Sequence, residues 1–355
     1  MRAGEVPRGL ASLDLAEDGL HVTNDELVCS IKAEDISIRW MNAYVPTADQ
    51  TIKVYQPSTI AFLHRSLKAY AGMVVRGRGI PSFIHPAQMN SATSMGTAMM
   101  VGSSSSSAAL TTCLNLARIC DTTLAGSNRA TADAVAAVLK REMDRLYAAV
   151  QQPRQPGAVV DHFASLAAFQ AYLLYALVLF FQLERQADPF LRQAIMALQE
   201  IACTSARHGL VCTAEQSSTN VRPRWAAWVL AEAKRRTLYV VYLFDSVLSA
   251  HDGLASYVGS ELRGLPAPSC KELWRASSLS EWTKAYQLYL DDWSEVGSAA
   301  EAGGAGLTID ELWAFPFPED TAGLARRRQR VDRWLESVDE YGTMMYAVTS
   351  STHGG

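Results

Sequence analysis

The sequence predicts an all-α fold, with many helices in one domain joined by irregular loops. Apolar residues recur at spacings of three and four over residues 222–252, which is one face of an α-helix. No stretch shows sustained alternation of apolar and polar residues, and no Asn-Gly or Asp-Gly pair joins two β-branched runs. Apolar residues make up 49% of the 355 residues and charged residues only 19%, which favours a large core over disorder.

The helix expected over residues 222–252 opens at Pro223 and stops at Gly253, residues that suit the two ends of a helix. Its inward face is apolar except for Glu232 and Arg236, which lie one turn apart. Charges on the buried side of a helix must be paired, because desolvation of a lone ion is costly. We therefore predict a structural ion pair between Glu232 and Arg236 that fixes how this helix packs.

The other elements follow from periodicity and helix-end residues. Residues 1–24 lack a clear period and are predicted to be a loose tail, followed by one helical domain over residues 25–350 and a tail at 351–355. Ser58 and Thr59 are expected to cap a helix that ends near Val75. Helices are also expected over residues 25–44, 110–120, 132–150, 161–185, 189–208, 280–293, 308–314 and 325–348.

Several of these elements carry distinct features. Residues 90–109 include five consecutive serines and are predicted to be a flexible insertion. The helix at 161–185 holds an apolar run over residues 171–181, too short to span a bilayer, so no membrane association is expected. Thr308 and Glu311 have the spacing of a capping box. Trp282, Tyr286, Tyr289 and Trp293 share one helix face.

The cysteines and the net charge narrow the function classes. The six cysteines, Cys29, Cys113, Cys120, Cys203, Cys212 and Cys270, form no Cys-x-x-Cys pair and are expected to be reduced, mostly buried thiols. The net charge of −4 lacks the basic excess of a nucleic-acid-binding domain. No apolar run near the start resembles a signal peptide.

The sharpest candidate for chemistry is the run Asp291, Asp292 and Glu295. In a helical protein such carboxylates can hold Mg²⁺ against a diphosphate, as in class I terpene cyclases. That chemistry needs a second metal-binding run further along the chain, and Asn24-Asp25 precedes the first run and has the wrong spacing. Because the aromatic residues occupy the inward face of this helix, we expect the carboxylates on its solvated side.

No other pattern indicates catalysis. The seven histidines form no zinc-binding helix motif, and no Gly-x-Ser-x-Gly elbow is present. Gly77-Arg78-Gly79 lacks a preceding strand and a third glycine, so it does not predict a phosphate site. His208 precedes a helix stop and is expected to cap it. The prediction is that the chain is not an enzyme and has no catalytic, cofactor-binding or metal residues.

A basic run near the end of the chain has two interpretations. It can contact phosphate or serve as a nuclear import sequence, or it can be the solvent-exposed face of an amphipathic helix. Its residues are Arg326, Arg327, Arg328 and Arg330.

Several ordered segments together resemble the regulatory domain of fungal-specific transcription factors, the helical region that follows a zinc cluster. The strongest is W-V-L-A-E-A-K-R-R-T-L-Y-V-V-Y-L-F-D, residues 228–245. The others are residues 34–44, 79–89, 140–147, 167–175, 265–276 and 330–342. The resemblance covers about residues 25–348, but the zinc cluster itself is absent from this sequence.

The resemblance implies a nuclear regulator of RNA polymerase II-type transcription in a fungus. Its partners would be regulatory proteins or a small-molecule effector, with a homodimer left open. DNA would be contacted only indirectly or through a missing N-terminal domain. No cofactor is expected, and zinc only if a cluster lies upstream. An effector would act by favouring one helical packing over another.

Two alternatives remain open. The scaffold can serve in a biosynthetic pathway as an enzyme or a small-molecule-binding protein, which requires polar groups converging in an internal cavity. Alternatively, it is a plain interaction scaffold, which predicts no cavity and an exposed apolar patch.

Overall fold

The computed structural model of the chain describes residues 21–45, 50–90, 106–124, 129–152, 160–216, 221–294, 306–313 and 320–350. The all-α prediction is confirmed: these residues form thirteen α-helices, and their only strands are two residues long each. The predicted tail at 351–355, most of the predicted tail at 1–24 and most of the serine-rich insertion lie outside the described residues.

The secondary structure follows the chain in this order. The α-helices are α1 Ala33–Ser37, α2 Pro57–Val75, α3 Ala87–Asn90, α4 Ala108–Leu124, α5 Arg129–Gln151, α6 His162–Phe181, α7 Pro189–Arg207, α8 Thr213–Gln216, α9 Trp225–His251, α10 Lys271–Arg275, α11 Leu279–Ser294, α12 Thr321–Ser337 and α13 Glu340–Ser350. The 3₁₀ helices are η1 Arg39–Met41, η2 Ser260–Leu262 and η3 Ile309–Leu312. The antiparallel strand pairs are β1 Leu27–Val28 with β3 Val211–Cys212, and β2 Ile52–Lys53 with β4 Ser256–Tyr257.

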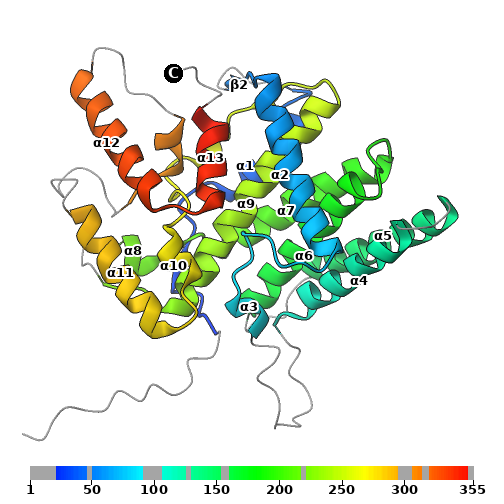
Figure 1. The fold of residues 1–355 in the computed structure, drawn as a ribbon, viewed down its shortest axis with the longest axis horizontal. Coiled ribbons are helices and arrows are strands. Elements are labelled where there is room, and N and C mark those ends of the chain that lie inside the picture. The colour runs from blue at the N-terminus through cyan, green and yellow to red at the C-terminus, as the bar shows by residue number, and fades with distance from the viewer. Residues whose placement is uncertain are drawn as a thin grey trace, which may run out of the picture.

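Helix α9 is the centre of the fold. It packs against α2, α6 and α7, and in Figure 1 these helices and α4 and α5 lie to one side of it, while α10, α11 and α12 lie to the other. Almost every side chain of α9 is therefore buried, including those outside the predicted apolar face. The helix starts at Trp225, two residues after Pro223, and stops before Gly253, whose φ is +68°.

Helix α6 is the second core element. The Asp161 side chain caps its first turn by accepting a hydrogen bond from the amide of Ala164. Of the helices described, it alone is long and apolar enough to cross a membrane, but 83% of its most apolar window is buried in the protein. A core helix has the same composition, so this helix is weak evidence for a membrane span.

The predicted helix over residues 25–44 is wrong. Only Ala33–Ser37 is α-helical, because Leu27 and Val28 pair their backbones with Cys212 and Val211 instead. Further on, the guanidinium of Arg39 is buried and paired with Asp245 at 3.1 Å and Glu261 at 2.8 Å. These partners lie about 200 residues further along the sequence, so no local sequence pattern reveals them.

The predicted continuous helix over residues 325–348 is also wrong, since it is two helices. Val338 has an extended backbone and pairs with Cys270, and Asp339 caps α13 by accepting from the amide of Gly342. The break places the Asp339 carboxylate against Arg236 of α9. An ion pair across the core therefore coincides with the interruption of an otherwise helical pattern.

Two predictions about helix ends have opposite outcomes. The capping box of Thr308 and Glu311 is confirmed, although the turn that it begins is 3₁₀ rather than α. The cap by Ser58 and Thr59 is wrong: α2 begins at Pro57 after Gln56, and no side chain caps it. Proline at the first helical position has a preset φ and lacks the N–H that a cap would satisfy.

We predict that Gly209→Ala destabilises the fold more than Gly264→Ala. Both glycines have left-handed φ, +90° and +83°, which costs alanine about 1–2 kcal/mol. A Cβ on Gly209 would lie 2.4 Å from the Cβ of Leu27, whereas a Cβ on Gly264 meets nothing within 4 Å. The overlap is expected to add about 1–3 kcal/mol to the loss. Urea unfolding of both variants measures the difference, and equal losses would contradict the close contact.

Candidate functional site

A buried ion network joins α9 to the C-terminal part of the chain. Glu232 accepts hydrogen bonds from Arg235 and Arg236, each at 2.7 Å, and the side chains of Glu232 and Arg236 have no exposed area. Arg236 also binds the carboxylate of Asp339 at 2.6 Å. Although burial opposes ionisation, the two guanidiniums lower the pKa of Glu232 to about 2. Two cations and two anions therefore balance in the core.

The network also fixes a loop that precedes α10. The amide and the hydroxyl of Ser269 donate to Glu232 at 2.9 and 3.1 Å, and the Ser269 carbonyl accepts from Arg236. The guanidinium of Arg236 lies 4.1 Å from the ring centre of Trp274 in α10, a cation–π contact. Tyr341 of α13 donates to the backbone carbonyl of Arg236. One arginine thus holds α9, α10 and α13 together.

A third cation of α9, Lys234, has no carboxylate partner among the residues that the structure describes. The ammonium of Lys234 is buried and donates to the carbonyls of His208 and Gly209, both at 3.1 Å. Burial lowers the pKa of Lys234 to about 7. His208 is the C-cap residue of α7, so the lysine satisfies carbonyls at the end of that helix.

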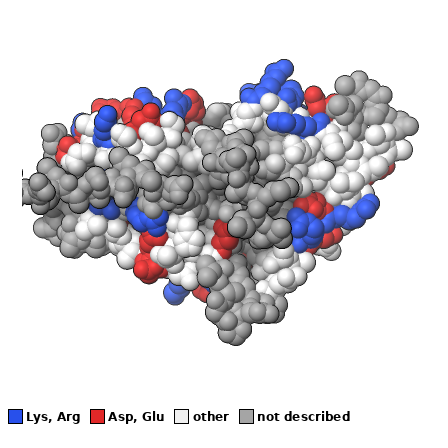
Figure 2. All heavy atoms as spheres, turned by 90° about the horizontal axis from the view of Figure 1, so that it is seen from below, with Lys and Arg blue, Asp and Glu red and all other residues white. Residues whose placement is uncertain are grey.

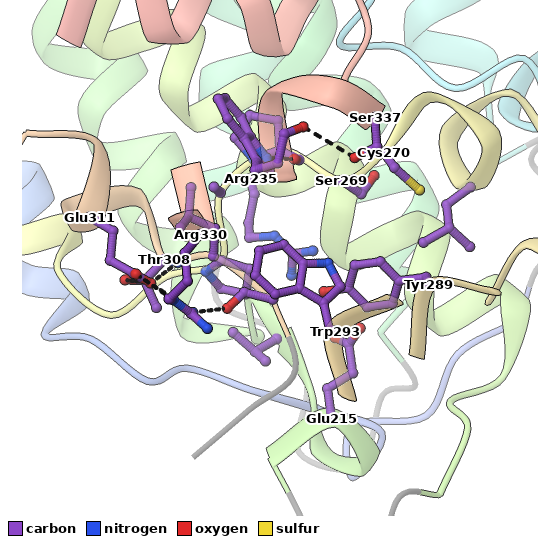
Figure 3. Close-up of a pocket in the computed structure, with 18 of the residues that line it drawn as sticks. Glu215, Arg235, Ser269, Cys270, Tyr289, Trp293, Thr308, Glu311, Arg330 and Ser337 are labelled. Atoms are coloured by element: carbon purple, nitrogen blue, oxygen red, sulfur yellow. Dashed lines mark hydrogen bonds and ion pairs between the residues drawn. The ribbon is translucent and has the colours of Figure 1, made fainter. Parts of the chain in front are cut away.

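A cavity of about 450 Å³ lies beside this network, between α9 and the C-terminal helices (Figure 3). This volume is in the range of small-molecule sites. Its walls come from β3, α8, α9, α10, α11, α12, η3 and the loop before α10. They include Val211, Glu215, Trp228, Arg235, Ser269, Cys270, Tyr289, Trp293, Gly306, Thr308, Glu311, Arg330, Trp334 and Ser337.

The cavity combines aromatic walls with two charged side chains, those of Arg235 and Glu215. Nε of Arg235 and Oε2 of Glu215 are both buried and make no hydrogen bond. Burial raises the pKa of Glu215, although the nearby Arg235 opposes this shift. Figure 3 shows both side chains converging on the region of Tyr289 and Trp293. An aromatic cavity with a few convergent polar groups is the usual form of a ligand site.

The predicted basic run divides into two pairs. Arg330 binds both carboxylate oxygens of Glu311 at the cavity wall, and its guanidinium lies 5.1 Å from the ring centre of Trp293. Arg327 donates to the carbonyls of Glu311 and Leu312. These two arginines attach α12 to η3, whereas the remaining pair, Arg326 and Arg328, is solvent-exposed.

The structure places the other candidate residues away from the cavity. Asp291 and Asp292 are exposed, as predicted; Asp292 pairs with Arg333 at 2.9 Å, and Glu295 lies outside the described residues. No histidine is among the residues that line the cavity beside the ion network. In the same part, no cluster of three or more His, Cys, Asp or Glu could hold a metal. All six cysteines are free and five are buried, as predicted.

Comparison of the chain with protein-family models, with curated proteins and with solved structures finds no match. The site must therefore be interpreted from its own geometry.

Sequence reasoning missed three residues of this region. Asp339 falls inside the helix predicted over residues 325–348, and no sequence pattern singles out Arg235 or Glu215. A triplet of cations at 234–236 within an apolar helix is a usable signal, because three successive residues point to three sides. That pattern indicates partners around the whole helix, but it does not identify them.

We predict that Glu232→Ala costs about 3–5 kcal/mol of unfolding free energy, because it removes the carboxylate that pairs with buried Arg235 and leaves Arg236 with Asp339 alone. As a control, Glu272→Ala removes an exposed carboxylate 3.7 Å from Lys271 and is expected to change stability by no more than about 0.5 kcal/mol. Chemical denaturation measures both variants. A loss below about 1 kcal/mol for Glu232→Ala would show that the carboxylate does not hold the arginines in place.

We predict that Lys234 makes stability rise with pH. The unfolded lysine keeps its proton up to about pH 10.5, whereas the folded one loses it near pH 7. Between these values the unfolded state binds more protons, so the unfolding free energy rises by up to about 1.4 kcal/mol per pH unit. Lys234→Met should remove this rise, whereas Lys271→Met, at a partly exposed lysine of α10, should keep it. Urea titrations at several pH values between 7 and 10 measure the unfolding free energy of each protein. If its slope against pH were the same in Lys234→Met as in the unsubstituted protein, the prediction would be refuted.

Proposed function

We propose that the chain is a regulatory domain that controls transcription in a fungal nucleus, through contacts with regulatory proteins and in response to a small molecule. The ordered resemblance of seven segments to fungal transcription-factor regulatory domains supports the class of function. The cavity between α9 and the C-terminal helices is the observation that carries ligand sensing.

The position of the cavity suggests how sensing would work. Ser269 lines the cavity and also donates to Glu232 of the ion network, and the indole of Trp334 lines it and donates to the carbonyl of Pro268. A ligand in the cavity would contact groups that attach α10 and α12 to α9. It would therefore favour the packing in which those groups best fit it, and shift the population toward that packing.

The surface supports contacts with proteins more than direct contacts with DNA. Figure 2 shows acidic and basic residues in small mixed clusters over the described part of one face, and the net charge is −4. Ile38, Tyr44 and Val45 around η1 are apolar and more than half exposed. Under this proposal DNA is reached through another domain or protein, since phosphate binding requires basic surfaces.

The proposal predicts that the chain, fused to a heterologous DNA-binding domain, changes expression of a reporter gene in fungal cells. Ser337→Trp, which fills the cavity, should change reporter output because it mimics or blocks the ligand. Ser66→Trp is the matched control: Ser66 is a partly buried serine of α2 that donates to a helix carbonyl, as Ser337 does, but lies outside the cavity.

Reporter output equal to that of the DNA-binding domain alone would contradict a role in transcription. If that output is accompanied by ligand binding to the purified chain, the alternative of a small-molecule-binding protein or enzyme in a biosynthetic pathway gains support. Equal output from Ser337→Trp and Ser66→Trp would instead contradict sensing through the cavity.

A further inference from the structure

One long stretch of the sequence carries cations and no acids. All 36 aspartates and glutamates of the chain lie outside residues 50–120, a span that contains six lysines and arginines. The cations of this span therefore have no carboxylate near them in the sequence, and pairs one helical turn apart, which often neutralise surface charge, cannot form within it.

Three of these cations follow one side of α2. Arg65 and Lys68 lie three residues apart on the helix and therefore share a face. Arg76, at the end of α2, continues this side, because a Cβ on Gly72 would lie 2.7 Å from Nη2 of Arg76. All three cations are exposed. From Arg65 to Arg76 the helix rises about 16 Å.

Arg118 of α4 joins the same surface from far along the chain. After α2 the backbone turns at Gly77, whose φ is +61°. A Cβ on Gly77 would lie 3.1 Å from Nε of Arg118, so this side chain packs against the turn that also carries Arg78. Both arginines are exposed. We call the five exposed cations the basic stripe: Arg65, Lys68, Arg76, Arg78 and Arg118.

The basic stripe lacks counter-charges. In the part of the chain that the structure describes, no ion pair links any of its five side chains to a carboxylate. Unpaired cations that lie together create a positive potential, which attracts an anionic partner.

An apolar groove opens at the end of the basic stripe. It has a volume of about 340 Å³ and is lined by Val74, Ile80, Met89 and Leu114, with Arg118 among its lining residues. Figure 1 shows the end of α2 beside α3 and α4, the helices that supply most of these side chains. The volume is at the lower end of the range of binding pockets.

The loop between α2 and α3, which forms part of the groove, is held in place by the core. Phe83 is fully buried, and its carbonyl accepts a hydrogen bond from Gln170 of α6 at 3.2 Å. Tyr70 and Ser82 share a hydrogen bond of 2.7 Å, and Gln88 donates to Gln170 at 3.0 Å. A partner would therefore meet a groove that is already formed, which lowers the entropic cost of binding.

Charge and shape together favour an acidic protein segment as the partner. The phosphate backbone of a nucleic acid would satisfy the cations, but it has no apolar group to place in the groove. Phe62, one turn before Arg65 on α2, adds a further apolar contact, since it is 41% exposed. A peptide in which carboxylates alternate with leucine or phenylalanine offers groups for both parts of the surface.

We propose that the basic stripe and its groove bind a short acidic segment of another protein, whose carboxylates meet the cations and whose apolar side chains enter the groove. This surface is separate from the cavity beside α9, because the two share no lining residue. The inference specifies the chemistry of a protein contact, and it rests on the proposed function only for the biological role of that contact.

Fluorescence anisotropy on the purified full chain tests the inference with three labelled peptides. D-E-L-D-D-F-L-D-E-L-E carries both features, D-E-S-D-D-S-S-D-E-S-E lacks the apolar side chains, and N-Q-L-N-N-F-L-N-Q-L-Q lacks the carboxylates. We expect the first peptide to bind at least about tenfold more tightly than either control, because each control loses one of the two contributions. A DNA duplex of mixed sequence and phosphatidylserine vesicles serve as alternative polyanions.

Charge reversal locates the site on the chain. Arg78→Glu combined with Arg118→Glu should weaken binding of the first peptide at least about tenfold, because two attractive contacts become repulsive. Lys68→Glu, away from the turn at Gly77, should weaken it about threefold for the same reason.

The matched control is Arg326→Glu combined with Arg328→Glu, which makes the same change in net charge at two exposed arginines of α12. It should leave binding of the first peptide within about twofold, because long-range effects of net charge are weakened by salt. Circular dichroism verifies that the variants are folded.

Three results would overturn the inference: no binding of the first peptide, equal binding of that peptide and either control peptide, or equal binding by the two double variants. Tighter binding of the duplex or the vesicles would replace the acidic segment with a phosphate-bearing partner. The reporter experiment tests the proposed function separately. Peptide binding without reporter activity refutes the role in transcription alone, and reporter activity without peptide binding refutes this surface alone.

Discussion

The structure depends on one buried carboxylate that is shared by two guanidiniums. Glu232 lies at the middle of α9 with no exposed area, and every hydrogen bond that it accepts comes from Arg235, Arg236 or Ser269. Ions in a core are tolerated only when each is paired and hydrogen-bonded. The helices around α9 must therefore bring partners to defined positions. Asp339 satisfies this requirement for Arg236, at the place where α12 ends and α13 begins.

The ion network and the cavity are two consequences of the same packing. Arg235 donates to Glu232 of the network and to the carbonyl of Leu210, and its side chain also lines the cavity. The loop that holds Ser269 against Glu232 also forms one wall of the cavity. A molecule in the cavity would thus contact the groups that align the C-terminal helices. Through these shared residues, a molecule bound in the cavity would be coupled to helix packing.

Local patterns predicted the helices that are anchored by their own sequence. The periodicity over residues 189–208 located α7, and the capping box located the turn at Thr308. Predictions failed where a distant partner competes with local preference. Strand pairing of Leu27 with Cys212 replaced a helix, and the bridge between Val338 and Cys270 divided another. In both cases the deciding contact joins residues far apart in the chain, which periodicity cannot represent.

The sequence by itself determined the all-α class, the dispersed and unpaired thiols, and the presence of Glu232 and Arg236 one turn apart on an apolar helix. Each of these depends only on composition or on spacing within one helix. Tertiary structure alone decided which acid balances Arg236, which arginines of the basic run are used to attach α12, and that Arg235 and Glu215 face one cavity. Those outcomes depend on how separate helices meet, because a cavity and its unpaired atoms belong to the spaces between elements rather than to any one of them.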